Sequence, residues 1–137
     1  MKSYTVRKTD VYVDTSALIA FLDRSDSYHA LFARLFAAPP KLITSSLVVA
    51  EGHGWFLRRY DRQRAAQFLD FMDQLPMTID PFDEDGLRRV TALIKKFKDQ
   101  TLTLADAAGL AIMQQRQLQQ CWSTDRHLSL LGVKLVV

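Results

Sequence analysis

The 137-residue chain lacks several features that would place it in a membrane or outside the cell. Its single cysteine, Cys121, excludes an internal disulfide and fits a reducing compartment. No apolar run reaches the roughly 20 residues that a membrane helix needs. The longest run, from Val11 to Leu22, is interrupted by Asp14 and followed by Asp23, so it also differs from a secretory signal. We therefore expect a cytoplasmic protein without a membrane segment.

Signatures of covalent catalysis are also missing. The chain has no Gly-x-Ser-x-Gly, no paired Cys and His signature, and no phosphate-binding loop ending in Gly-Lys-Ser or Gly-Lys-Thr. Its three histidines, His29, His53 and His127, show no spacing typical of a metal site, so we expect them at the surface or in the core.

The composition is that of an ordinary globular protein, with 48% hydrophobic and 24% charged residues. The length fits one domain over residues 1–137, in which the polar residues 1–10 would form a short N-terminal arm.

Short apolar runs alternate with amphipathic stretches along the rest of the chain. Strands are expected at 11–13, 41–44, 77–79, 119–123 and 133–137. Helices are expected at 17–22, 27–38, 47–57, 62–74, 84–97 and 104–113, with a helical turn at 125–131. This alternation predicts an α/β fold, a three-layer α/β/α sandwich with a mainly parallel central sheet. Ligands of such folds bind beyond the carboxyl ends of the strands.

Four carboxylates, Asp14, Glu51, Asp106 and Asp125, stand where apolar runs meet helix starts or an apolar helix face. A carboxylate in apolar surroundings is costly unless it is hydrogen-bonded, paired with a cation or bound to a metal. All-oxygen ligands favour hard cations, so Mg²⁺ or Mn²⁺ is a better partner than zinc. The four acids together predict a divalent metal site suited to phosphate chemistry.

Three of these acids have a structural alternative. Asp14 could cap the helix that follows it, and Asp125 could open the helical turn after the fourth expected strand. Asp106 stands three residues after Thr103, which fits a capping box. Each acid taken singly is therefore open to both interpretations.

No cap explains Glu51. Its neighbours at three and four residues are largely apolar, so we expect its carboxylate on an apolar helix face, with an ion pair to Arg58 as the alternative. Gly52 and Gly54 follow it at a cost to helix stability of roughly 1 kcal/mol each relative to alanine, which indicates close packing or a kink.

Basic residues are in excess outside the four acids. The chain has 18 Lys and Arg against 15 Asp and Glu, so without the four acids the remainder carries +7. Such a surface attracts polyanions, although a solvated helix face is the simpler explanation for either basic cluster alone. The two clusters are Arg58, Arg59, Arg62 and Arg64, and Lys95, Lys96 and Lys98.

Four motifs stand in the order and at the spacing of a known family. They are Val13-Asp14-Thr15-Ser16-Ala17, Ser45 to Glu51, Thr103 to Ala107, and Ser123-Thr124-Asp125-Arg126-His127. In these residues the chain resembles the PIN-domain nucleases from about Asp10 to Val137, and its size resembles the VapC-type toxins of toxin-antitoxin modules.

The resemblance implies an Mg²⁺- or Mn²⁺-dependent endoribonuclease that forms a homodimer and is inhibited by a small antitoxin. It assigns metal binding to Asp14 and Asp106 and a supporting acidic role in the same cluster to Glu51 and Asp125. It gives Thr15 and Thr124 a polar or water-positioning role.

Two other functions compete with this hypothesis. A catalytically idle PIN module would bind RNA or a protein partner without cleavage, and the complete acidic set argues against it. A phosphatase of the haloacid-dehalogenase type would need a second aspartate where Ser16 stands.

Overall fold

The computed structural model describes residues 10–137, and its elements follow the expected alternation. The strands are β1 (Val11–Val13), β2 (Leu42–Ser45), β3 (Met77–Asp80), β4 (Gln120–Trp122) and β5 (Lys134–Leu135). The helices are α1 (Thr15–Leu22), α2 (His29–Ala37), α3 (Ser46–Arg59), α4 (Arg62–Gln74), α5 (Glu84–Lys96) and α6 (Leu104–Arg116), with a 3-10 turn η1 (Arg126–Ser129). Residues 1–9 of the expected arm lie outside the described residues, and Asp10 is buried beside β1.

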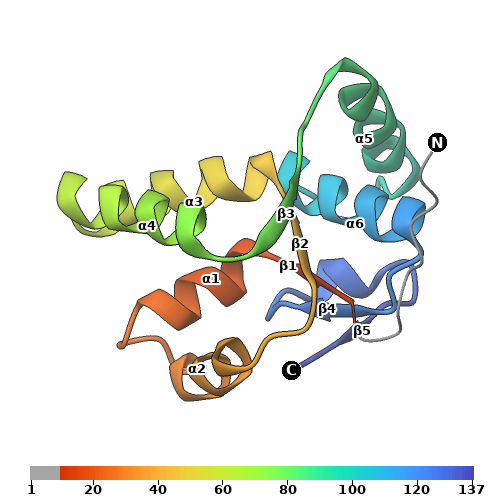
Figure 1. The fold of residues 1–137 in the computed structure, drawn as a ribbon. Coiled ribbons are helices and arrows are strands. Elements are labelled where there is room, and N and C mark those ends of the chain that lie inside the picture. The colour runs from red at the N-terminus through yellow and green to blue at the C-terminus, as the bar shows by residue number, and fades with distance from the viewer. Residues whose placement is uncertain (1–9) are drawn as a thin grey trace.

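All pairings in the five-stranded sheet are parallel, in the order β3-β2-β1-β4-β5. Figure 1 shows α1 to α4 on one side of this sheet and α5 and α6 on the other. The expected α/β sandwich with a parallel sheet is thus confirmed. The chain leaves β1 toward β2 and β3 and later returns to β4 on the other side of β1. Strand order therefore reverses between β1 and β4, the place where such sheets bind ligands.

Burial on both faces explains the apolar sequences of the central strands. Val11, Tyr12 and Val13 of β1 are at most 1% exposed, as are Leu42 and Ile43 of β2. Strands covered by helices on both faces are expected to be continuously apolar rather than alternating. The edge strand β3 is more open, with Ile79 40% exposed.

Polar side chains cap the N-terminal ends of several helices. The Ser45 hydroxyl accepts a hydrogen bond from the Val48 amide at the start of α3, and the Asp83 carboxylate accepts one from the Gly86 amide in α5. Thr103 and Asp106 form the expected capping box of α6. Such caps satisfy amides that the first helical turn leaves without partners.

Two glycines allow close packing between elements. A methyl group added at Gly109 of α6 would lie 2.8 Å from Cδ1 of Leu128 and 2.9 Å from Cε1 of Tyr12, so α6 approaches β1 and η1 closely there. At Gly52 of α3 the same group would lie 2.3 Å from Cζ of Phe68 in α4. The close packing expected near Glu51 is therefore present at Gly52.

No helix within residues 10–137 has both the length and the apolar character needed to cross a bilayer.

Gly52→Ala should destabilise the fold. Phe68 is 1% exposed and stacks on Phe56 at 5.6 Å between ring centroids, so its ring cannot move into solvent to accept a methyl group. We expect a loss of about 1–3 kcal/mol in the free energy of unfolding, the usual cost of overpacking a core. Urea or thermal unfolding measures it.

Gly54→Ala is the matched control. Its added methyl would meet Nη1 of Arg58 at 3.0 Å, the end of a flexible and exposed side chain. That variant should gain up to about 1 kcal/mol of helix propensity. Equal stabilities of the two variants would contradict the packing argument.

Candidate functional site

Asp14 lies at the junction of β1 and β4 and is held from both sides. Its Oδ2 accepts hydrogen bonds from the hydroxyls of Ser16 at 3.0 Å and Ser123 at 2.9 Å. Those hydroxyl oxygens accept in turn from the backbone amides of Thr124 at 3.0 Å and Asp125 at 2.9 Å. The amides occupy acceptor positions on the serines, which directs the hydroxyl protons toward the carboxylate. Both hydroxyl bonds fall on one oxygen, so Oδ1 of Asp14 has no hydroxyl donor.

Asp14 occupies the N-cap position of α1, but its side chain makes no capping hydrogen bond. The structural alternative that the sequence allowed for this residue is therefore wrong. Instead, the carboxylate accepts a hydrogen bond from the hydroxyl of Ser123, which lies across the β1–β4 junction and 109 positions further along the chain.

Asp106 caps the N-terminus of α6 and also lies close to the other acids. Its Oδ2 accepts from the Thr103 amide at 3.2 Å, while the Thr103 hydroxyl accepts from the Asp106 amide at 3.1 Å. This capping box engages one carboxylate oxygen and leaves the other without a capping bond.

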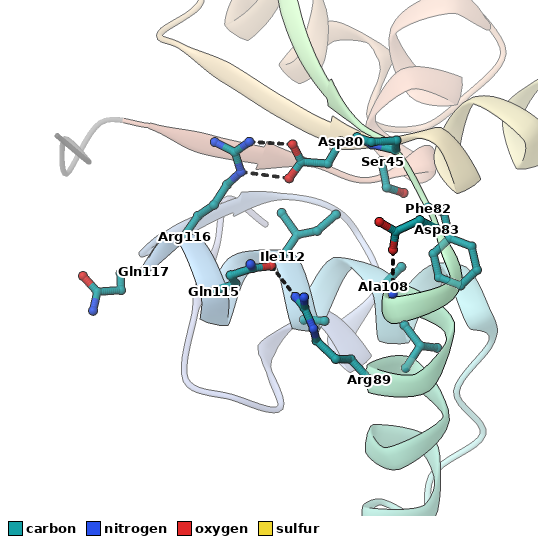
Figure 2. A pocket seen from close by; sticks show the side chains of 14 residues that line it. Ser45, Asp80, Phe82, Asp83, Arg89, Ala108, Ile112, Gln115, Arg116 and Gln117 are labelled. Carbon is teal, nitrogen blue, oxygen red and sulfur yellow. Dashed lines mark hydrogen bonds and ion pairs between the residues drawn. The ribbon is translucent and has the colours of Figure 1, made fainter. Parts of the chain in front are cut away.

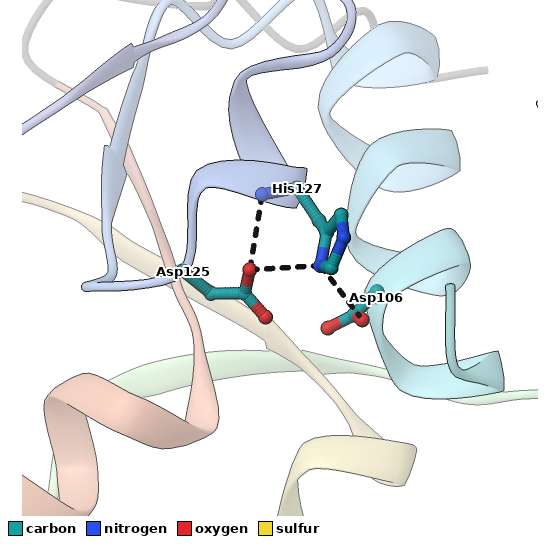
Figure 3. Close-up of side chains that lie close together, drawn as sticks. All are labelled: Asp106, Asp125 and His127. Atoms are coloured by element: carbon teal, nitrogen blue, oxygen red, sulfur yellow. Dashed lines mark hydrogen bonds and ion pairs between the residues drawn. The ribbon is translucent and has the colours of Figure 1, made fainter. Parts of the chain in front are cut away.

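Asp125 is arranged in the same way. Its Oδ1 accepts a hydrogen bond from the His127 amide at 3.0 Å, and this bond caps η1. The same oxygen lies 3.0 Å from Nδ1 of the His127 side chain. That imidazole nitrogen is also 3.8 Å from Oδ2 of Asp106. Asp106, Asp125 and His127 each offer a ligand atom within 4.8 Å of the others. Figure 3 shows the second oxygens of Asp125 and Asp106 on facing sides of the gap between them.

Glu51 differs from the expectation. It is exposed in α3, because the buried positions of that helix are Val48, Gly52 and Phe56, so the predicted placement on an apolar face is wrong. Within residues 10–137 no ion pair joins Glu51 to Arg58. The Glu51 carboxylate still acts on the site through space, since its negative charge helps to raise the pKa of Asp14.

Burial dominates the electrostatics of the acids, and repulsion between them adds to its effect. Burial raises the pKa of the Asp14 carboxyl, and the hydroxyls of Ser123 and Ser16 only partly oppose this. Burial also raises the pKa of Asp106, and the charges of Asp125 and Asp14 add to the rise. No Lys or Arg within residues 10–137 forms an ion pair with Asp14 or Asp106. The negative charge of these carboxylates is therefore not balanced by any Lys or Arg of the described residues.

Thr15 and Thr124 also lie at the β1–β4 junction. The Thr15 hydroxyl is buried and has no hydrogen-bond partner within the described residues, a state that costs about 1–3 kcal/mol unless a water or ligand joins it. Thr124 contributes its backbone amide to Ser16. A water-positioning role for either hydroxyl stays a prediction.

Ser16, Ser123 and His127 were missed by reasoning from the sequence. The two serines stand within two residues of a predicted acid, and this proximity was the available signal. His127 was expected at the surface or in the core, yet it is half-buried against two carboxylates. Its position depends on the 3-10 turn, which brings a side chain two residues after Asp125 back toward that acid.

The donor set fits a hard divalent cation. Asp106 and Asp125 are each oriented through one oxygen while a second oxygen remains, and Asp14 has an oxygen without a hydroxyl donor. A cation there would also offset the repulsion that raises the pKa values of Asp14 and Asp106. The residues present are thus suited to Mg²⁺ or Mn²⁺.

A separate cavity of about 580 Å³ lies between β3, α5 and α6 and is lined by none of the four predicted acids. Figure 2 shows its polar walls paired with one another: Arg116 Nε donates to Asp80 at 2.8 Å, and Arg89 donates to Gln115 at 2.7 Å. Its chemistry is therefore distinct from that of the acids.

Comparison with known families agrees with this arrangement. The model of the PIN domain matches residues 11–134, which include all four predicted acids. The chain belongs to the PIN-domain family. A comparison with curated proteins finds no match.

Solved structures share the fold of this PIN domain. VapC20 of Mycobacterium tuberculosis, described as a sarcin-ricin loop cleaving toxin, aligns with a TM-score of 0.83 at 22% identity, over 90% of this chain and 96% of that one. A toxin-antitoxin complex from Klebsiella pneumoniae aligns with a TM-score of 0.62 at 23% identity, over 93% and 96%. VapBC2 of Rickettsia felis, bound to a promoter DNA fragment, aligns with a TM-score of 0.62 at 13% identity, over 92% and 96%.

Asp14→Asn should stabilise the metal-free PIN domain at pH 7. Burial raises the folded-state pKa of Asp14 above its unfolded value, so stability is full below about pH 4 and is lost as pH rises through the raised pKa. An asparagine carries no charge and escapes this loss. We expect its Tm in EDTA to exceed that of the parent by at least about 4 °C at pH 7, and the gap to close toward pH 4.

Asp73→Asn provides the control, because it removes an exposed carboxylate of α4 and should produce no such pH-dependent gap. A lower Tm for Asp14→Asn than for the parent at pH 7 would contradict the assigned electrostatics.

Proposed function

We propose that this PIN domain is a metal-dependent endoribonuclease that hydrolyses RNA phosphodiester bonds. The observation that carries the proposal is the convergence of Asp14, Asp106 and Asp125 beside the β1–β4 junction, where no Lys or Arg of the described residues forms an ion pair with them. Carboxylate-held divalent ions typically serve phosphate chemistry. The family, whose members include nucleases, supports the same reaction class.

Asp14, Asp106 and Asp125, with Glu51 at the exposed side, would hold Mg²⁺ or Mn²⁺. When bound, the ion would activate water and neutralise the charge that develops on the phosphate. The protein's own contribution is orientation. Ser16 and Ser123 fix the direction of the Asp14 carboxylate, and His127 fixes that of Asp125. The hydroxyls of Thr15 and Thr124 would position water.

We further propose that the protein is the toxin of a toxin-antitoxin pair, acting in the cytoplasm as a homodimer with a small protein antitoxin. Support comes from the length as well as the fold, because the alignment covers 96% of the matched chain in each of the three solved structures described above.

Cleavage should require both the metal and the acids. With Mg²⁺ the parent should cut single-stranded RNA, EDTA should stop it, and added Mg²⁺ should restore it. Asp14→Asn should lower the rate at least about 100-fold, because it removes a charged ligand from the site. Gel analysis of a labelled RNA measures the rate, and circular dichroism confirms that the variant is folded.

Asp73→Asn should cut at the parental rate. A folded Asp14→Asn that cuts as fast as the parent would refute the mechanism. Magnesium-independent RNA binding without cleavage by the parent would instead support an idle PIN module.

Toxicity can be tested in cells. Induced expression of the parent should arrest bacterial growth, whereas Asp14→Asn at equal abundance should not. Co-expression of a small neighbouring reading frame should restore growth if it encodes the antitoxin. Growth arrest of equal strength by both proteins would show that the effect does not depend on catalysis.

A further inference from the structure

The connection between α3 and α4 carries a cluster of exposed cations. Arg58, Arg59 and Arg62 are exposed, Arg64 is half-buried, and Figure 1 shows the α3–α4 connection at the end of the helix pair away from the sheet. No carboxylate within residues 10–137 forms an ion pair with any of these four arginines. Asp61 lies among them, but its carboxylate caps α4 through the Arg64 amide.

Aromatic rings lie among these arginines. The guanidinium of Arg64 is 4.3 Å and that of Arg59 5.1 Å from the centroid of the Tyr60 ring. Trp55 is half-buried and lies 6.2 Å from the same ring, while the Tyr60 hydroxyl donates to Asp23 at 2.9 Å. We name Trp55, Arg58, Arg59, Tyr60, Arg62 and Arg64 the hairpin tip. Its rings and stacked guanidinium planes offer both flat faces and phosphate-binding edges.

The hairpin tip is continuous with the acidic site. Glu51, Trp55 and Arg58 recur at spacings of four and three residues, so they share one face of α3. The Arg58 guanidinium folds back over Gly54, where the missing side chain leaves room for it. Seven residues of helix separate Glu51 from Arg58 by only about 10 Å. A strand leaving the acids along α3 would therefore reach Arg58 first and then the rest of the tip.

We infer that the hairpin tip binds a single-stranded stretch of RNA that continues from the scissile phosphate along α3. Unpaired guanidinium groups would neutralise phosphates, and Trp55 would stack on a base, the combination by which proteins hold single strands without reading sequence. An acidic protein segment would satisfy the arginines but, unlike RNA, does not offer a planar base at every position for the rings to stack on. The inference rests on the proposed function, because it supplies the reason why RNA would approach along α3.

Binding to single-stranded RNA tests the tip separately from cleavage. In an Asp14→Asn background, which keeps the RNA intact, Arg58→Ala/Arg62→Ala should weaken binding to a labelled strand of about 20 nucleotides roughly tenfold at about 0.1 M salt. The salt dependence should also fall, by about 1.4 in the slope of log K against log salt, because two phosphate contacts are lost.

Lys95→Ala/Lys98→Ala is the matched control. It removes the same charge from exposed positions at and just beyond the end of α5. Equal losses in the two double variants would show that only net charge matters and would overturn the inference. Poly-glutamate is the competing probe: if the arginine variant loses as much affinity for it as for RNA, the tip is a site for acidic protein segments rather than for RNA.

Tryptophan fluorescence tests stacking. The chain has two tryptophans, and Trp122 is only 4% exposed, so quenching by added RNA reports mainly on Trp55. Quenching that disappears in the arginine variant supports the inference, whereas RNA binding without quenching would overturn the stacking role.

Cleavage of two substrate lengths separates this inference from the proposed function. The arginine variant should lose more activity on the 20-nucleotide strand than on a trinucleotide too short to reach the tip. A parent that cuts neither RNA would refute the proposed function. A parent that cuts both, with equal relative losses in the arginine variant, would refute the tip alone.

Discussion

Holding a buried carboxylate at the β1–β4 junction is the constraint on which the rest of the site depends. Asp14 is 4% exposed, so its charge must be met by hydrogen bonds or a cation. The serines that meet it come from the start of α1 and the end of β4, and backbone amides after β4 orient them. Any change in the register of β1 against β4 would break the two bonds that cross the junction, from Ser123 to Asp14 and from Thr124 to Ser16. The parallel pairing of these strands thus determines the local chemistry.

Structural and functional explanations of the acids are compatible in this protein. Asp106 completes a capping box and Asp125 caps η1, so the simple alternatives for both residues are realised. Each cap engages a single oxygen of a group that has two. The capping bonds thereby orient carboxylates that repel one another. Their favourable free energy offsets part of the electrostatic repulsion between the acids.

The fold was largely predictable from the sequence, since the alternating elements, the capping box at Thr103 and the ordered motifs all depend on local patterns. The site was only partly predictable. Neighbours at three and four residues suggested an apolar face for Glu51, but α3 turns Gly52 inward against Phe68 and leaves Glu51 outside. His127 joins the acids through a 3-10 turn whose direction depends on tertiary packing. Helical periodicity does not reveal that a glycine occupies the buried stripe of α3 or which way the 3-10 turn points.

The distances between the acids also depend on Gly109, a residue that is not itself acidic. It lies one helical turn after Asp106, where α6 rests on Tyr12 of β1 and Leu128 of η1. Those two elements immediately precede Asp14 and follow Asp125 along the chain. The absence of a single methyl group therefore sets how closely three separate parts of the backbone approach. Evolution of this fold could adjust the size of its ion site through position 109 while leaving every carboxylate in place.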